Sequence, residues 1–173
     1  MSFPLRCDNQ MSTMPTSIGM NATMPMHTHM NPRRLATIAI AVTLALVLSS
    51  CLSANQTKMV NYINSSRRHV GKPAMKATET ASAKAQRWAE HMAATGVVEH
   101  SGGGSRMSTA GLPTWCAAAE NVAKALSTAN AHDLWMKSAS HKANILGNYN
   151  RVGTGVVRKG NYVYAVQVFY RTC

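Results

Sequence analysis

Hydrophobic residues at helical spacing predict a first helix that begins near residue 59. Met59, Val60 and Ile63 fall on one face of this helix. Residues 71–73 read Gly-Lys-Pro, and they end it because glycine and proline do not continue a helix. The segment of residues 52–57 is short and polar, so we expect it to form a brief tether before the helix.

A second helix is predicted over residues 78–95. Small and large apolar side chains recur there at helical spacing. They are Ala81, Ala85, Trp88 and Met92, with Ala89 and Ala93 widening the stripe. Gly96 follows as a C-terminal cap. The glycine- and proline-containing residues 101–114 show no period and are expected to form a loop.

The next part of the chain predicts shorter elements. Residues 120–128 fit neither a helix nor a strand clearly. Asn130 is expected to cap a helix that begins there, with Asp133 reinforcing the cap. Residues 140–146 predict a further short turn of helix, which Gly147 ends.

The C-terminal part predicts a β-hairpin. Residues 152–157 and 162–170 flank a turn at residues 159–161. The second strand is apolar on both faces, with Gln167 as the polar exception, and such a strand must be covered on both sides. Together with the amphipathic helices, this predicts an α+β fold. Its expected form is a three-layer α/β/α sandwich with a C-terminal antiparallel hairpin.

An export signal is predicted before residue 52. Arg33 and Arg34 precede an apolar run over residues 35–48, which is short for a bilayer span but typical of a signal-peptide core. The run ends in Leu48-Ser49-Ser50-Cys51, which resembles the bacterial lipobox. There a signal peptidase cuts before a cysteine that carries lipid. We therefore expect lipidation at Cys51; the alternative is a buried helix that ends at a core cysteine.

This signal predicts how the chain is divided and where it acts. The predicted parts are a doubtful or disordered leader at residues 1–29, a lipoprotein signal peptide at 30–50, a lipidated tether at 51–55 and the folded domain at 56–173. The expected location is the bacterial envelope, with the protein held at a membrane through Cys51. Leu52, in place of Asp after the cysteine, favours the outer membrane, facing the periplasm.

Cysteine count and charge agree with export. After Cys51 the chain keeps Cys116 and Cys173, an even pair that predicts a disulfide in an oxidising compartment, with two free thiols as the alternative. Fifteen basic and five acidic residues follow Cys51, a net charge of +10. Such a surface attracts anionic lipid, cell-wall polymer or nucleic acid, unless the charge serves solubility alone. Export argues against nucleic acid.

Two histidines and one glutamate stand among apolar neighbours. They are His100, Glu120 and His141, and each could be a hydrogen-bonded structural group, a base or a metal ligand. They fall within an ordered series of motifs. The series is Asn64-x-x-Arg67, Ala85-x-x-Trp88-Ala89-x-x-Met92-Ala93-x-x-Gly96-x-x-x-His100-Ser101, Glu120-Asn121-Val122-Ala123, Trp135-x-x-Ser138-x-x-His141-x-x-Asn144-Ile145-Leu146 and Val152-Gly153-Thr154-Gly155.

This series resembles the CAP superfamily in its bacterial SCP-like form, over residues 56–172. The resemblance implies an α/β/α sandwich whose cleft holds two histidines and up to two acids, at which several members bind zinc or another divalent ion. His100, His141 and Glu120 match the two histidines and the first acid, while Ser138 stands where the second acid falls. We expect these four side chains and Asn144 to line the cleft. Two imidazoles and one carboxylate could still hold zinc, with water as the fourth ligand.

Three functions are compatible with this reading. The favoured one is a non-enzymatic binding module of the envelope for a lipid, a cell-wall fragment or a partner protein. The second is a hydrolase, in which His100, Glu120 and His141 activate a metal-bound water, or Ser101 or Ser138 acts as the nucleophile. No nucleophile elbow is recognisable, which weighs against it. The third is a structural surface lipoprotein with a vestigial site.

Overall fold

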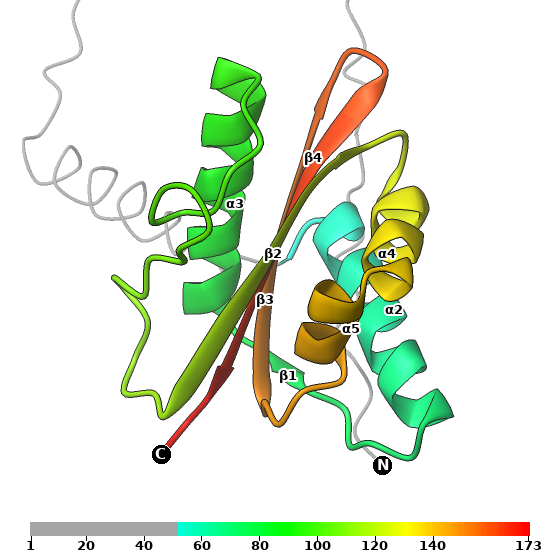
Figure 1. The fold of residues 1–173 in the computed structure, drawn as a ribbon, viewed down its shortest axis with the longest axis vertical. Helices are drawn as coiled ribbons and strands as arrows, with labels where there is room; N and C mark the ends of the chain where they lie inside the picture. The colour runs from blue at the N-terminus through cyan, green and yellow to red at the C-terminus, as the bar shows by residue number, and fades with distance from the viewer. Residues whose placement is uncertain (1–51) are drawn as a thin grey trace, which may run out of the picture. The chain divides into compact units, whose positions relative to one another are not determined.

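A four-stranded sheet lies between two layers of helices in the computed structural model, which describes residues 52–173 (Figure 1). The predicted signal peptide and Cys51 lie outside these residues. The helices are α2 (Ala54–His69), α3 (Glu79–Thr95), α4 (Thr128–Lys137) and α5 (Ala139–Ile145). The strands are β1 (Lys76–Ala77), β2 (Ala117–Ala125), β3 (Arg151–Lys159) and β4 (Tyr162–Arg171). None of the helices in this part is long and apolar enough to cross a membrane.

The strands are ordered β1-β3-β4-β2, with β4 antiparallel to both of its neighbours and β1 parallel to β3. Helix α3 covers one face of the sheet, and α2, α4 and α5 cover the other (Figure 1). This arrangement confirms the predicted three-layer α+β sandwich. The hairpin is also confirmed, because Lys159 pairs with Tyr162 across the turn.

Strand β4 is buried on both faces, as its apolar sequence predicts. Val163, Ala165 and Phe169 join a hydrophobic cluster with side chains of α2, α4 and α5. The opposite face contributes to a second cluster, against α3. Its residues from β4 are Tyr164, Val166, Val168 and Tyr170. The central strand therefore supplies the core on both sides of the sheet.

Helix α3 lies unusually close to β3 at two glycines. A Cβ atom on Gly153 would come within 2.1 Å of the Ala81 carbonyl carbon, and one on Gly155 within 2.2 Å of the Ala85 carbonyl oxygen. Real Cβ atoms do not approach backbone so closely, so only glycine fits at these positions. The alanine stripe of α3 and the two glycines therefore set the spacing of this layer.

Two helix starts differ from the prediction. Helix α2 begins at Ala54 because Ser53 and Gln56 form a reciprocal capping box, so residues 54–57 are helical and the expected tether is shorter. Helix α4 begins at Thr128, where Ser127 and not Asn130 is the N-cap. The side chain of Ser127 accepts a hydrogen bond from the Asn130 amide.

Side chains from both helical layers cover the outer edge of β3 beyond β1. Gln56 on α2 donates its amide to the Thr154 carbonyl at 2.8 Å. From α3, Ser82 Oγ accepts a hydrogen bond from the Thr154 amide at 3.4 Å, and Gln86 accepts one from the Val156 amide at 3.0 Å. These bonds occupy backbone groups that an edge strand otherwise leaves exposed.

Arg67 joins three separate parts of the chain at the end of α2. Its buried guanidinium donates hydrogen bonds only to backbone carbonyls in the described part of the chain: those of Pro73, Ile145, Gly147 and Tyr149, at 2.8–3.3 Å. The sequence marks this residue within the Asn64-x-x-Arg67 motif but does not show its role. That role is to hold the loops after α2 and α5 together.

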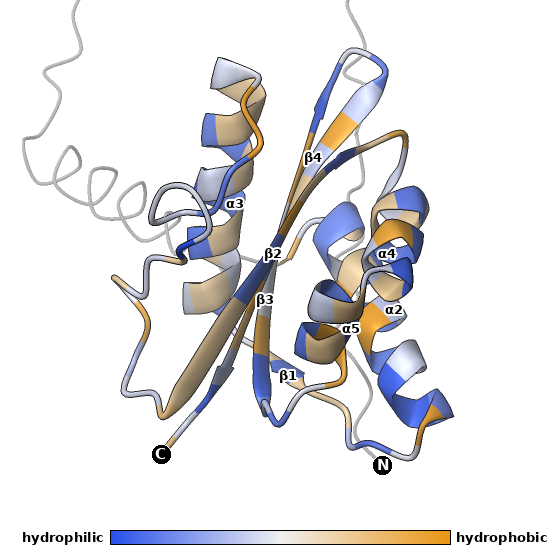
Figure 2. Cartoon of the chain, in the orientation of Figure 1, coloured by the Kyte–Doolittle hydropathy of each residue, from blue (hydrophilic) through white to orange (hydrophobic). Residues whose placement is uncertain are grey.

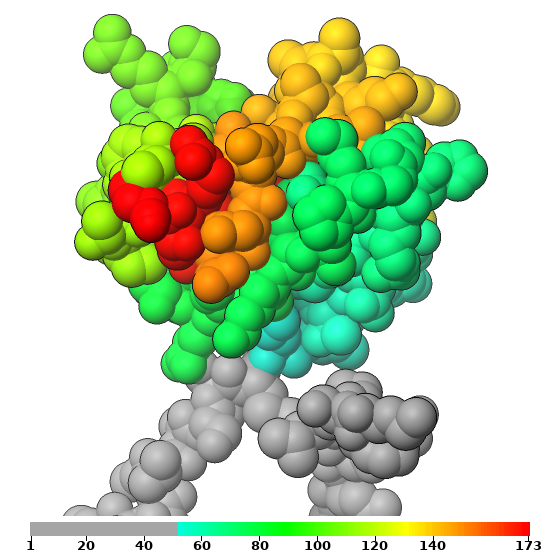
Figure 3. All heavy atoms as spheres, turned by 90° about the horizontal axis from the view of Figure 1, so that it is seen from below, coloured from blue at the N-terminus to red at the C-terminus, as the bar shows by residue number. Residues whose placement is uncertain are grey.

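The predicted disulfide is confirmed between Cys116 and Cys173, whose Cα atoms are 5.1 Å apart. It joins the residue before β2 to the end of the chain after β4. In the view from below, the red C-terminal residues lie against the yellow-green segment that precedes β2 (Figure 3). The bond therefore reinforces the pairing of the two strands at this end of the sheet.

Candidate functional site

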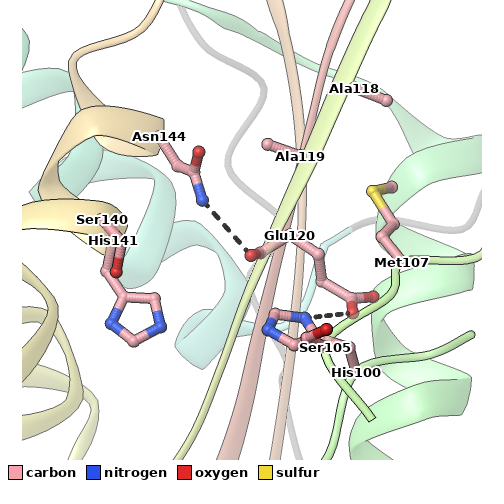
Figure 4. Close-up of a pocket in the computed structure, with 9 residues that line it drawn as sticks. All are labelled: His100, Ser105, Met107, Ala118, Ala119, Glu120, Ser140, His141 and Asn144. Carbon is pink, nitrogen blue, oxygen red and sulfur yellow. Dashed lines mark hydrogen bonds and ion pairs between the residues drawn. The ribbon is translucent and has the colours of Figure 1, made fainter. Parts of the chain in front are cut away.

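The three predicted site residues come from three different elements and meet at one cleft. His100 lies in the loop after α3, Glu120 on β2 and His141 on α5. The cleft has a volume of about 290 Å³. Its lining residues are His100, Ser105, Met107, Ala118, Ala119, Glu120, Ser140, His141 and Asn144 (Figure 4). It follows the edge strand β2, with the loop on one side and α5 on the other.

Glu120 fixes the position of His100. Its side chain is fully buried, and Oε1 accepts a hydrogen bond from Nδ1 of His100 at 3.0 Å and one from the Ser101 amide at 2.9 Å. Because a carboxylate only accepts, Nδ1 of His100 carries the proton, and in the neutral ring Nε2 keeps its lone pair. Figure 4 shows this second ring nitrogen on the side of the ring that faces His141.

His141 stands across the cleft from this pair. Burial lowers the pKa of His141, and the neighbouring His100 lowers it further. The ring is therefore neutral at pH 7. The two rings together present imidazole nitrogens to the same space (Figure 4).

A network of amides holds α5 against β2. Asn144 donates to Oδ1 of Asn121 at 2.9 Å, and Asn121 donates to the His141 carbonyl at 3.1 Å and to Oε1 of Gln167 at 3.0 Å. Asn144 lines the cleft as predicted, but its amide is committed to this network. The supporting role of Gln167 was missed, although a lone polar residue on an apolar strand is the signal that indicates it.

Two further residues at the site escaped the sequence reasoning. The first is Ser140, which lines the cleft. The predicted Ser138 does not line it, because Ser138 is the C-cap of α4. The hydroxyl of Ser138 lies 3.3 Å from that of Ser140. Lys84 on α3 is close enough for its charge to interact with Glu120. Partial burial lowers the pKa of Lys84, and attraction to the Glu120 carboxylate opposes that effect.

The described residues do not bring three metal-binding side chains together. Among them, no group of three His, Cys, Asp or Glu side chains lies close enough to hold a metal ion. Glu120 instead uses Oε1 to hold His100, and its Oε2 is buried without a partner in this part of the chain. The arrangement therefore does not fit the expected set of three zinc ligands. Zinc binding stays a prediction, and no chemical step is assigned to a metal.

The layered fold and the paired His–Glu unit facing a second histidine define a domain of the CAP class. The chain belongs to the Cysteine-rich secretory protein family, whose model matches residues 60–171. This confirms the resemblance seen in the sequence. No curated protein matches the chain.

Solved structures of similar fold include three of different origin. An outer surface protein from Borrelia burgdorferi has a TM-score of 0.59 at 14% identity, covering 70% of this chain and 95% of that chain. Venom allergen-like protein 4 of Schistosoma mansoni scores 0.55 at 14% identity, covering 69% and 90%. An extracellular SCP-domain protein from Bacillus anthracis scores 0.60 at 19% identity, covering 72% and 45%. At these identities the likeness concerns the fold.

Proposed function

We propose that this protein is an exported, membrane-anchored CAP-domain protein whose cleft binds a ligand without converting it. Two observations support export: the names of two structural neighbours place them at a bacterial surface or outside the cell, and the chain carries a disulfide. The lipobox-like sequence that ends at Cys51 supports the anchor and the location in the envelope. The outer membrane, with the domain facing the periplasm, is the location that Leu52 favours.

The observation that carries the proposal is that, in the described part of the chain, no serine hydroxyl at the cleft is hydrogen-bonded to His100 or His141. Glu120 is bound to His100 and Ser101. The hydroxyl of Ser101 accepts a hydrogen bond from the Ser108 amide, and among the described residues it has no bond to an imidazole such as a serine nucleophile makes to its base. Such an arrangement gives a rigid recognition surface and lacks a nucleophile next to a base.

The size and lining of the cleft limit its ligand. A volume of about 290 Å³ lies at the lower end of the range for ligand pockets. The imidazoles and the Ser140 hydroxyl suit a compact polar group with donors and acceptors. A fragment of a cell-wall polymer or a lipid headgroup fits this description better than an acyl chain does.

A hydrolase is the second candidate, and the His100–Glu120 hydrogen bond favours it. A carboxylate that orients an imidazole is the arrangement of a general base. Turnover of an ester or a casein substrate that disappears in His100→Ala, with the fold intact, would establish this function. It would also overturn the non-enzymatic proposal.

Titrations of residues 52–173 followed by NMR test the binding function. The probes are soluble muropeptides, glycerophosphoglycerol and zinc ion, each added separately. One of the two organic probes is expected to shift the His100 and His141 resonances saturably at one site per chain, and His141→Ala is expected to abolish the shift. His69→Ala, which removes an exposed histidine outside the cleft, should leave binding unchanged. Equal response of both variants, or no response to either organic probe, would contradict the proposal.

The zinc arm tests the metal prediction separately. One zinc ion per chain, lost in His141→Ala, would show that the two histidines converge on a metal. A lack of zinc binding would remove the metal and leave the binding module standing.

A further inference from the structure

Three segments of the chain meet at one end of the sheet. They are residues 94–98 at and beyond the end of α3, residues 124–127 at and beyond the end of β2, and residues 158–163 at the hairpin turn. We call this surface the hairpin tip. Nζ of Lys159 lies 2.6 Å from the Ala93 carbonyl and 3.2 Å from the Ala94 carbonyl, which joins the hairpin to the end of α3. Strand pairing of Ala125 with Val163 brings the β2 segment beside it.

Exposed hydrophobic side chains gather on the hairpin tip. Of the seven exposed large hydrophobic residues in the described part of the chain, four lie here. They are Val97 at 53%, Val98 at 42%, Leu126 at 62% and Tyr162 at 43% exposure. Figure 2 shows the hydrophobic colouring of the loop after α3, beside this end of the hairpin. Grouped exposure of this kind indicates an interaction surface.

The charge of the hairpin tip has one sign. Lys124, Arg158 and Lys159 are exposed, and none of the three segments contains an aspartate or glutamate. The ammonium of Lys124 lies 4.6 Å from the centre of the Tyr162 ring and 5.6 Å from that of Tyr164. A tyrosine beside basic residues, with aliphatic neighbours, is the composition of a surface that sits at a membrane–water interface.

The direction of α2 places the start of the domain toward the same end. Near its beginning, Gln56 contacts Thr154 on β3; near its end, Arg67 contacts Tyr149, just before β3. Helix α2 therefore runs antiparallel to β3, which runs toward the hairpin turn. The chain thus enters the domain from the half that carries the hairpin tip.

We propose that the hairpin tip docks on an anionic lipid bilayer. Lys124 and Arg158 attract the acidic headgroups, and Leu126, Tyr162 and Val97 enter the interfacial layer. The proposal rests on the proposed function in one respect, since a lipid on Cys51 would supply the anchor and the hairpin tip the second attachment. Two weak signals of this kind together give stable membrane binding, whereas one acyl chain alone gives marginal binding.

Vesicle sedimentation of residues 52–173 tests the surface without the anchor. This segment forms one compact unit with both hydrophobic clusters and the disulfide. The vesicles contain phosphatidylglycerol with phosphatidylcholine, or phosphatidylcholine alone, at low salt. The protein is expected to pellet with the anionic vesicles and to remain in the supernatant in the presence of the neutral ones. Added salt should weaken binding to the anionic vesicles.

Matched variants separate the hairpin tip from the general positive charge. Lys124→Glu is expected to weaken binding at least about tenfold, since one basic residue near the surface contributes about fivefold and the variant also reverses the charge. Lys72→Glu makes the same change at the far end of α2, and less than about a twofold loss is expected. Leu126→Ser with Tyr162→Ser is expected to lose about tenfold, and Leu134→Ser, on α4, almost nothing.

Three results of the vesicle assays would overturn the proposal. They are no binding of the wild type to anionic vesicles, equal losses in Lys124→Glu and Lys72→Glu, or binding that the double variant retains. Pelleting with purified sacculi that Lys124→Glu abolishes, without vesicle binding, would assign the surface to a wall polymer and also overturn it. The anchor is tested separately, by measuring the mass of the peptide that contains Cys51 after expression of the full chain. A failure of the lipidation prediction and a failure of the hairpin-tip proposal are therefore distinguishable.

Discussion

Ser66 on α2 and His132 on α4 share a hydrogen bond of 2.8 Å between Oγ and Nε2. The ring of Tyr62 stacks on the same imidazole, with centroids 5.6 Å apart. His132 is buried, and among the described residues its Nδ1 has no hydrogen-bond partner. The two helices of this layer are thus joined by a buried histidine whose charged, doubly protonated form is disfavoured.

This histidine is expected to make stability depend on pH. Burial lowers the pKa of His132 from its ordinary value of 6.5, and Asp133 opposes the effect only in part. Below pH 6.5 the unfolded chain binds a proton that the folded chain does not, so stability is complete above that pH and falls as the pH decreases. The loss is at most about 1.4 kcal/mol per pH unit for one such group.

Urea unfolding at pH 7.5 and 5.5 checks this dependence. The free energy of unfolding of His132→Asn should change less between the two values than that of the wild type. His141 adds a dependence of the same sign, so a smaller slope remains. His69→Asn, an exposed control, should keep the full slope. Identical slopes in wild type and His132→Asn would contradict the assignment.

Gly155→Ala is expected to disrupt the packing of α3 on the sheet. The added Cβ would lie 2.2 Å from the Ala85 carbonyl oxygen, which is rigid backbone, so α3 must move. We expect a loss of about 3 kcal/mol or more in the free energy of unfolding. Gly160→Ala is the control: its φ of 58° strains an alanine, but its Cβ meets no atom within 4 Å. It should cost about 1–2 kcal/mol. A smaller loss in the free energy of unfolding for Gly155→Ala than for Gly160→Ala would contradict this, because it would show that α3 can move away from β3 at little cost.

Arg67→Met should destabilise the corner between α2 and α5. The substitution keeps much of the volume but removes the guanidinium donor from four carbonyl groups, of which Gly147 still accepts from the Tyr149 amide. Each unsatisfied buried acceptor costs about 1–3 kcal/mol, so we expect at least about 3 kcal/mol in total after relaxation. Arg68→Met, at the exposed neighbouring position, should change stability by less than about 0.5 kcal/mol. Chemical denaturation of both variants compares them directly.

Removing the disulfide should also weaken the fold. Cys116 and Cys173 are separated by 57 positions, and closing a loop of this length contributes about 4 kcal/mol in the chain-entropy model. The double variant Cys116→Ser with Cys173→Ser should unfold at correspondingly lower urea. A reducing agent should bring the wild type to the same midpoint and leave the variant unchanged. If the reduced wild type keeps its midpoint, the bond contributes nothing to stability.

The sequence predicted the elements whose burial pattern is unambiguous. Strand β4 is apolar at nearly every position, which required cover on both faces and led directly to three layers. Residues 120–128 fit neither element clearly, and strand β2 is not predicted there, because five of its nine residues are alanine, which has little preference for a strand. Strand β1 has only two residues, too few for any period to show.

The motifs in the sequence predicted the three main residues of the candidate site. They did not predict the residues that surround those three. His100, Glu120 and His141 stand in the sequence as recognisable motif positions, and the fold brings them to one cleft. Ser140 lines that cleft because α5 begins at Ala139, a detail of register that spacing alone does not fix. Likewise, nothing in the sequence near Lys84 indicates that tertiary packing places its charge near Glu120.

The covered edge of β3 has a consequence for how copies of this protein can associate. An open-ended fibril that grows by strand addition requires every molecule to offer one sheet edge to the copy before it and another to the copy after it. Gln56, Ser82 and Gln86 occupy one of these edges from within the same molecule. Pairing through β2 alone would stop at two copies, so these three side chains hinder polymerisation by strand addition at Thr154 and Val156.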